Sequence, residues 1–315
     1  MHGKSIHIEL LVLLLICLWS APVRAAQESA VVAILLSDSE EAYGRPVTTF
    51  SEEIERPVSV FNLHGDIMHD PDLKEKLFAA RPALIFALGA KAAYAARLWT
   101  EERRDIPVIF AMVLNWQRYK LTEGRENMAG IAAEMAPGTQ FANMIMFSPA
   151  VRRIGLLYSP QSGQIFDQAR EAADLLGLEL VAESIDHSRD LRLAFKKISA
   201  KVDAFWVLND PLIYTMENLD WLEKRCVRDK LFCVGQTLNI AKLGLTLSVN
   251  SDNDQLGVQA GAMARNILER GQTPKDIGVM APLNTQIIVN LNTAAKIGTN
   301  ISPQALDLAT SIIGR

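Results

Sequence analysis

Residues 151–185 constrain the fold most, because they read as a strand, a helix and a second strand. The apolar run 154–158 is short enough for a buried strand, and Pro160 marks the turn after it. Apolar residues then recur at helical spacing until Gly177, where a second apolar run begins. Such a crossover makes the two strands parallel. The loop after Tyr158 then lies at the carboxyl edge of the sheet, where open parallel sheets bind ligands.

The same alternation recurs on both sides of this segment. Apolar runs predicted as strands before Pro137 are 31–36, 58–63, 83–88, 108–113 and 128–132, and those after it are 154–158, 178–181, 202–208, 231–235, 245–249, 279 and 286–289. Helical patterns separate most of them, but the segment after Ser39, which contains Tyr43, Gly44 and Pro46, is poorly periodic and no element is assigned to it. The pattern predicts an α/β fold with two doubly wound parallel-sheet lobes and a hinged cleft that closes on a ligand.

The first 26 residues have the three-part composition of a secretory signal peptide. Lys4 supplies a positive charge, an apolar core spans 10–19, and small residues flank Arg24 at a cleavage site. The alternative is an uncleaved anchor helix, which normally needs about 20 apolar residues. We therefore expect a cleaved leader and a periplasmic protein.

Composition and motifs exclude several kinds of function. The net charge is −4 and no basic face stands out, which argues against nucleic acid as a partner. The sequence has no GxSxG, Walker or HExxH motif, so we expect no enzyme, no catalytic residue and no cofactor. His64 and His69 lie near two aspartates, but their spacing fits no metal site better than it fits a polar loop, so no metal is expected.

Two cysteines, Cys226 and Cys233, remain after removal of the leader. An oxidising compartment allows a disulfide between them. Placed near a helix end and in the following strand, they are interpreted as two buried thiols in preference to a disulfide.

The candidate ligand-binding residues are those that leave each strand at the carboxyl edge. In the first lobe they are Ser37, Asp38, Gly89, Ala90, Lys91, Leu114, Asn115 and Trp116, and in the second they are Ser159, Gln161, Asn209, Asp210, Gln236 and Thr237. Asp210 precedes a proline, so it is equally a helix cap or turn residue and a ligand contact. Helix N-termini after these loops offer N–H groups that could hold a ligand carboxylate or phosphate. Tyr43 and Trp116 could stack on a flat ligand, although packing within the lobe is the favoured interpretation for each.

Several segments, in their order, resemble the ABC-transporter substrate-binding family that includes tryptophan- and tyrosine-binding proteins. The segments are ALIFALGAKAAYAA (83–96), IPVIFAMV (106–113), VRRIGLLYSP (151–160), KVDAFWVLND (201–210), DNDQLGVQAGAMARNILERGQTP (252–274) and VNLNTAAKIG (289–298). The resemblance covers nearly the whole chain after the leader, and it implies a type I periplasmic binding fold that crosses between lobes three times. We accordingly expect lobe 1 at 27–134 plus 250–273, and lobe 2 at 135–249 plus 274–315.

The resemblance also carries ligand contacts onto Gly89 to Lys91, the segment after Val113, Asn209 with Asp210, and Gln236 with Thr237. The loop 114–117 and the segment after the first strand depart from the family pattern, so the ligand is not copied from a relative.

Two functions of different classes fit these features. The first is a monomeric solute-binding protein that delivers a small organic ligand, with an amino acid as the leading candidate, to an ABC permease and its ATPase. The alternative is a periplasmic sensing module that reports its ligand to a membrane receptor or kinase.

Overall fold

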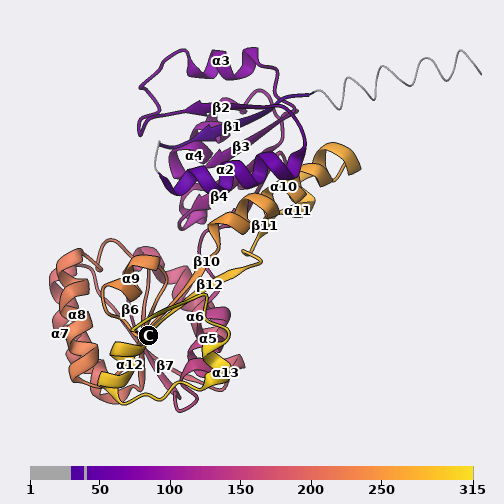
Figure 1. Ribbon diagram of the computed structural model, residues 1–315. Helices are drawn as coiled ribbons and strands as arrows, with labels where there is room; N and C mark the ends of the chain where they lie inside the picture. Colours follow the sequence, from indigo (N-terminus) through magenta and orange to yellow (C-terminus); the bar gives the residue numbers. More distant parts are fainter. Residues whose placement is uncertain (1–29, 39–40, 315) are drawn as a thin grey trace, which may run out of the picture. The chain divides into compact units, whose positions relative to one another are not determined.

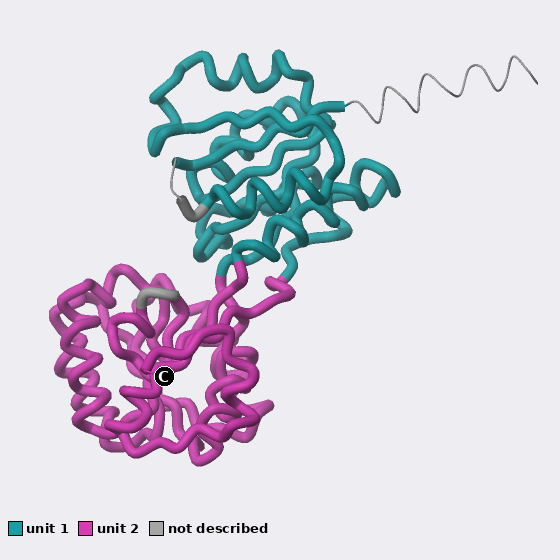
Figure 2. The backbone as a smooth tube through the Cα atoms, viewed as in Figure 1, with its two compact units in different colours: residues 1–133, 253–280 teal, residues 134–252, 281–315 magenta. Residues whose placement is uncertain are grey.

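The structure is a computed structural model that describes residues 30–38 and 41–314. The expected signal peptide lies outside the described residues. Contacts divide the chain into two compact units, residues 1–133 with 253–280 and residues 134–252 with 281–315. Figure 2 colours these units teal and magenta, and the chain passes between them three times. Among the described residues, no helix is long and apolar enough to cross a membrane.

Unit 1 is built on a parallel sheet in the order β11-β5-β4-β3-β1-β2. Its strands are β1 (Val32–Leu36), β2 (Val58–Asn62), β3 (Leu84–Leu88), β4 (Val108–Val113), β5 (Met128–Ala132) and β11 (Val279–Met280). Its helices are α2 (Glu41–Ile54), α3 (Leu73–Ala79), α4 (Ala90–Trp99), the 3₁₀ helix η1 (Trp116–Tyr119), α10 (Asn253–Arg270) and α11 (Pro274–Ile277).

Helices cover both faces of this sheet. Alternate residues of β1 and β3 face a core beneath α3 and α4, which includes Leu77 and Ala92. The remaining residues face a second core beneath α2 and α10, which includes Phe50 and Leu256. Burial on both faces explains why these strands are continuous apolar runs in the sequence.

Unit 2 contains a seven-stranded sheet in the order β13-β12-β10-β9-β8-β6-β7. The pairs are parallel except β10 with β12. Its strands are β6 (Arg153–Tyr158), β7 (Glu179–Ser184), β8 (Ala204–Val207), β9 (Phe232–Gly235), β10 (Leu247–Ser251), β12 (Thr285–Asn290) and β13 (Ser311–Ile313). Its helices are α5 (Pro137–Phe147), η2 (Pro160–Ser162), α6 (Gly163–Leu175), η3 (Ser188–Asp190), α7 (Leu191–Ile198), η4 (Ser199–Lys201), α8 (Met216–Arg228), α9 (Leu238–Lys242), α12 (Leu291–Ile297) and α13 (Pro303–Leu306) (Figure 1).

Helix α2 forms in the poorly periodic segment to which the sequence assigned no element. It spans 14 residues and includes Gly44 and Pro46, both poor helix formers in a helix interior. Its partner is α10, about 200 positions later in the chain, and the two helices lie side by side in Figure 1. Packing against a distant helix, and not local propensity, therefore accounts for α2.

Two glycines allow this close approach. A Cβ added to Gly261 would lie 2.6 Å from Cγ of Glu53, and one added to Gly257 would lie 2.9 Å from the backbone nitrogen of Phe50. Polar contacts reinforce the pair, since Thr49 donates a 2.8 Å hydrogen bond to the carbonyl of Asp254 in the first turn of α10.

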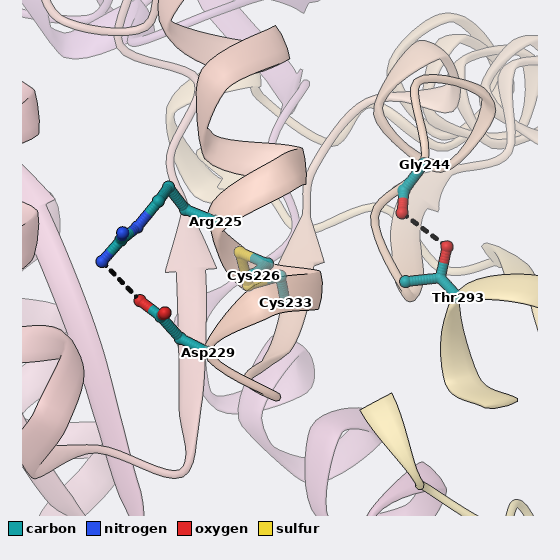
Figure 3. The surroundings of a disulfide bond; sticks show 6 residues. All are labelled: Arg225, Cys226, Asp229, Cys233, Gly244 and Thr293. Atoms are coloured by element: carbon teal, nitrogen blue, oxygen red, sulfur yellow. Dashed lines mark hydrogen bonds and ion pairs between the residues drawn. A yellow bond between two sulfur atoms is a disulfide. The ribbon is translucent and has the colours of Figure 1, made fainter. Parts of the chain in front are cut away.

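A disulfide joins Cys226 of α8 to Cys233 of β9, so the interpretation as two free thiols is wrong (Figure 3). Their Cα atoms lie 6.2 Å apart, within the range that a disulfide spans. The short connection after α8 folds back tightly, with Leu231 N–H donating to the Cys226 carbonyl at 2.9 Å. This turn brings the first residues of β9 under the last turn of the helix.

Residues 274–280, assigned above to the second lobe, group with unit 1. The reason is β11, whose two residues pair in parallel with Gly130 and Ile131 of β5. The Gly130 N–H also donates a 3.0 Å hydrogen bond to the carbonyl of Gly278. This short ladder extends the first sheet by one strand.

Candidate functional site

Ser37 and Gly89, from the ends of β1 and β3, lie against each other in unit 1. Ser37 is 5% exposed, and its hydroxyl oxygen accepts a 2.9 Å hydrogen bond from the Ala92 N–H in the first turn of α4. Gly89 has φ +87°, and a Cβ there would lie 2.6 Å from Oγ of Ser37 and against the hydroxyl of Tyr43. Only glycine fits this position, because any side chain there would overlap Ser37 and Tyr43. The end of β1 can therefore pack directly against the backbone at the start of α4.

Asp38 and Lys91 extend the same group of residues. The Lys91 ammonium donates to the carbonyl of Gly65, whose own N–H donates to the Ser37 carbonyl at 2.9 Å. A Cβ on Gly65 would lie 3.1 Å from a carboxylate oxygen of Asp38 and 3.9 Å from Nζ of Lys91. The structure thus gathers Ser37, Asp38, Gly89, Ala90 and Lys91 at one edge. Gly65 lies with these residues but was not among the predicted ones. The only signal for it in the sequence is its position just after a predicted strand.

The predicted residues after β4, 114–116, lie at an irregular turn. The pairing of β4 with β5 shifts register between Phe110 and Val113, and Asn115 has the left-handed φ of 47°. Leu114 is 47% exposed at this turn. Trp116 packs on the core instead, with its ring centroid 6.1 Å from that of Phe110. Trp116 therefore contributes packing, as the favoured interpretation had it.

In unit 2, Asp210 connects the loops that leave β6 and β8. One carboxylate oxygen accepts hydrogen bonds from the Ser159 N–H at 3.0 Å and the Ser162 hydroxyl at 2.7 Å. The other accepts the Leu212 N–H at 3.1 Å. Asp210 is 3% exposed, so its carboxylate is held inside the unit. Sequence reasoning placed both loops at this edge but did not identify Ser162.

Tyr214 fixes the same loop from the other side. Its hydroxyl donates a 3.0 Å hydrogen bond to the Leu157 carbonyl of β6. Burial, and after it the charge of Asp210, raises the pKa of the Tyr214 phenol. The Tyr214 phenol and the Asp210 carboxylate thus tie this loop to β6 and to the loop after β6 through four hydrogen bonds in total, one of which is the local bond to Leu212.

The remaining predicted residues of unit 2 are more accessible. Gln161 is exposed, whereas Asn209, Gln236 and Thr237 are half-buried. The Thr237 carbonyl accepts a 2.7 Å hydrogen bond from the Ser248 hydroxyl of β10, which ties the loop after β9 to the next strand. Side chains able to meet a ligand at this edge are therefore mostly uncharged amides and hydroxyls.

Two surface hollows lie elsewhere in unit 1. One, of about 540 Å³, is lined by His64, His69, Asp70 and Lys76 beside β2. The other, of about 590 Å³, lies between residues 104–107 and 271–276. Neither includes a predicted ligand-binding residue. The two imidazole rings of the first hollow are 5.1 Å apart, but within the described chain no three His, Cys, Asp or Glu side chains are placed to hold a metal ion.

The sequence matches a protein family and a curated relative. The family model for ABC transporter substrate binding proteins matches residues 56–313. An uncharacterised protein from Rickettsia prowazekii is 28% identical over 152 residues, which is 47% of this chain and 48% of that protein. The chain therefore spans about half the length of that curated relative.

Solved structures share the fold. A ligand-free, open substrate-binding protein with adhesive properties from Clostridium difficile matches with a TM-score of 0.75 and 20% identity, over 91% of this chain and 100% of that one. An ABC domain from Streptococcus pneumonia in complex with L-Trp matches with a TM-score of 0.61 and 21% identity, over 90% of this chain and 100% of that one. A periplasmic ribose ABC transporter structure from Conexibacter woesei gives 0.55 at 13% identity, covering 86% and 95%. At these identities the matches establish the architecture, two mainly parallel sheets of the type I periplasmic binding fold.

Proposed function

Because this chain belongs to the ABC transporter substrate-binding protein family, we propose that it is the extracytoplasmic solute-binding protein of an importer and takes a small organic molecule. Proteins of this family bind solutes for a transporter and are not enzymes. The transporter's permease and ATPase are the partners that this role requires. Closure of two lobes on the ligand, expected from the fold class, is part of the proposal.

One observation carries the ligand-binding role. The loops at the carboxyl ends of the strands are held in place by hydrogen bonds of their own side chains. Ser37 caps α4 beside Gly89, and Asp210 joins the two loops of unit 2. Open α/β sheets bind ligands at this edge. An amino acid remains the leading ligand class, supported by the resemblance and by a structural neighbour that was solved with L-Trp.

The disulfide supports an extracytoplasmic location. Cys226 and Cys233 are 1% and 0% exposed, and disulfides of this buried kind persist in oxidising compartments. The proposed signal peptide would deliver the chain there. Fractionation of cells that produce the tagged full-length chain tests this part, with recovery of the shorter, processed form in the periplasm as the expected result.

A thermal-shift screen tests the binding function. The protein without residues 1–26 is heated with amino acids, nucleosides, sugars and small carboxylates. A ligand present at a hundredfold excess over its Kd stabilises the folded state by about 2.7 kcal/mol. A saturable rise with no chemical change in the ligand supports solute binding. A folded protein that responds to no member of these classes counts against import of a small solute.

A further inference from the structure

The N-terminal end of the helical segment formed by η2 and α6 is a position that attracts anions. Unpaired N–H groups and the helix dipole both favour negative charge there, and many proteins hold a ligand phosphate or carboxylate in this way. The sequence analysis accordingly allowed a ligand acid at such helix starts. In α6 the segment continues for 13 residues beyond η2, long enough to have a substantial dipole.

In this protein the carboxylate of Asp210 lies at the start of this segment, where it is hydrogen-bonded to Ser159 and Ser162. Its Oδ2 accepts the Ser159 N–H, directly before η2, at 3.0 Å and the Ser162 hydroxyl, at the end of η2, at 2.7 Å. Its Oδ1 accepts the Leu212 N–H at 3.1 Å, so both oxygens are used. A buried charge needs such partners, because removal from water strongly disfavours an unpaired one.

The charges around Asp210 reinforce this assignment. Among the described residues, no Lys, Arg or His forms an ion pair with it. The groups that face it are the neutral Tyr214 phenol and the donors of Ser159, Ser162 and Leu212. The carboxylate is therefore balanced by N–H and O–H groups at the helix end, and its negative charge is not cancelled by a neighbouring cation.

We propose that Asp210 is a built-in anion that occupies the α6 N-terminal position, holds the loops after β6 and β8 together, and directs neutral or cationic ligand groups to this edge. A ligand carboxylate or phosphate is excluded because its place is taken and because Asp210 repels it. Asp210 is thus a positioning and selectivity residue, in contrast to a residue that itself binds a ligand acid. The claim that Asp210 selects ligand groups rests on the proposed solute-binding function. The claim that Asp210 fills the helix end does not depend on that function.

The occupancy can be tested with acetate, which supplies the carboxylate that Asp210→Ala removes. The melting temperature of the wild type, Asp210→Ala and Asp210→Asn is measured in rising sodium acetate, with sodium chloride at equal ionic strength as the salt reference. Asp210→Ala should melt several degrees below the wild type and recover much of this loss in acetate. Asp210→Asn fills the same space with an amide, so it should be destabilised without an acetate response.

A matched control comes from the other end of the same helix. Asp174→Ala removes one carboxylate from the surface of unit 2, whereas the Asp210 carboxylate is buried, and it should leave both the melting temperature and the acetate response close to those of the wild type. If Asp210→Ala does not fold in chloride alone, its folded yield on refolding in acetate replaces the melting temperature as the readout.

Equal acetate responses in the wild type and Asp210→Ala would overturn the proposal, because the helix end would then be open in the native protein. An absent response in Asp210→Ala would overturn it as well. Neither result depends on an organic ligand, so failure here and failure of the thermal-shift screen are separate outcomes.

Discussion

Cys226, in the last turns of α8, is bonded to Cys233, in the middle of β9, across a sequence separation of only 7 residues. Both sulfurs lie in the core of unit 2. Two residues beyond Cys233, the strand ends and continues into Gln236 and Thr237. The bond therefore fixes the helix to the strand that delivers two candidate ligand-binding residues.

Replacing both cysteines with alanine should lower the stability of the protein. Loop-closure entropy for a loop this short gives about 2.5 kcal/mol, less any strain that the native bond carries. Urea unfolding of the double variant and the oxidised wild type, with the melt of the reduced wild type as the control, measures the difference. A double variant as stable as the oxidised protein would show that the bond is dispensable for folding.

Gly257→Ala should destabilise unit 1 although alanine is the better helix former. The added methyl meets Thr49, Pro46 and Phe50 of α2, and overpacking of this kind costs about 1–3 kcal/mol. Gly163→Ala is the matched control, because no atom lies within 4 Å of its added Cβ and its effect should be neutral or slightly stabilising. Urea unfolding of both variants checks the prediction, and equal midpoints would contradict it.

Gly89→Ala should disturb the carboxyl edge of unit 1, where the candidate ligand-binding residues lie, through two effects. The left-handed φ of +87° strains an alanine, and the new Cβ pushes against Ser37, which caps α4. Strain alone accounts for about 1–3 kcal/mol. Gly124→Ala separates the effects, since its φ is +65° but nothing lies within 4 Å. Thermal melts with and without the ligand found by screening should show a lost ligand response only for Gly89→Ala.

Asp203 should make the stability of unit 2 sensitive to acid. The Arg153 side chain, followed by the backbone N–H groups of Arg152 and Arg153, lowers the pKa of this carboxyl. A lowered pKa in the folded state means that the stabilisation is complete above the unfolded value, about 4, and is lost as the pH falls through the folded value.

Asp203→Asn should therefore cost about 1 kcal/mol at pH 7 and progressively less below pH 4. Denaturation midpoints at a series of pH values measure this, with Asp174→Asn as a control of equal charge change. A cost that stays constant from pH 7 to pH 3 would rule out the ionised carboxylate as its source.

The strands were predictable because their physical signature is local. Runs such as 84–88 and 204–207 are buried on both faces of their sheets, so almost every residue is apolar. The loops at the carboxyl edge followed from the strand positions, and the structure places Ser37, Gly89 and Lys91 together as a result. The order of strands and crossovers thus fixed where the edge lies.

Features that depend on distant partners were not predictable in the same way. Helix α2 carries Gly44 and Pro46 and is supported by Gly257 and Gly261, whose role no local window reveals. The direction of the Asp210 side chain depends on Ser159 and Ser162, which are about 50 positions away. The disulfide depends on how tightly the chain turns after α8, and spacing alone does not give that distance.

The discontinuity of unit 1 has a consequence for the order in which this protein can be assembled during synthesis. Residues 30–133 emerge first, yet their sheet lacks β11 and one of its faces lacks α10 until residue 280 has been made. Nascent chains shorter than this therefore leave Phe50, Ile54 and Phe86 without the α10 side chains that cover them. Incomplete chains of this kind leave apolar surface exposed, which is the kind of surface that chaperones recognise. The sheet and the second core of unit 1 are therefore complete only after residue 280 has been made.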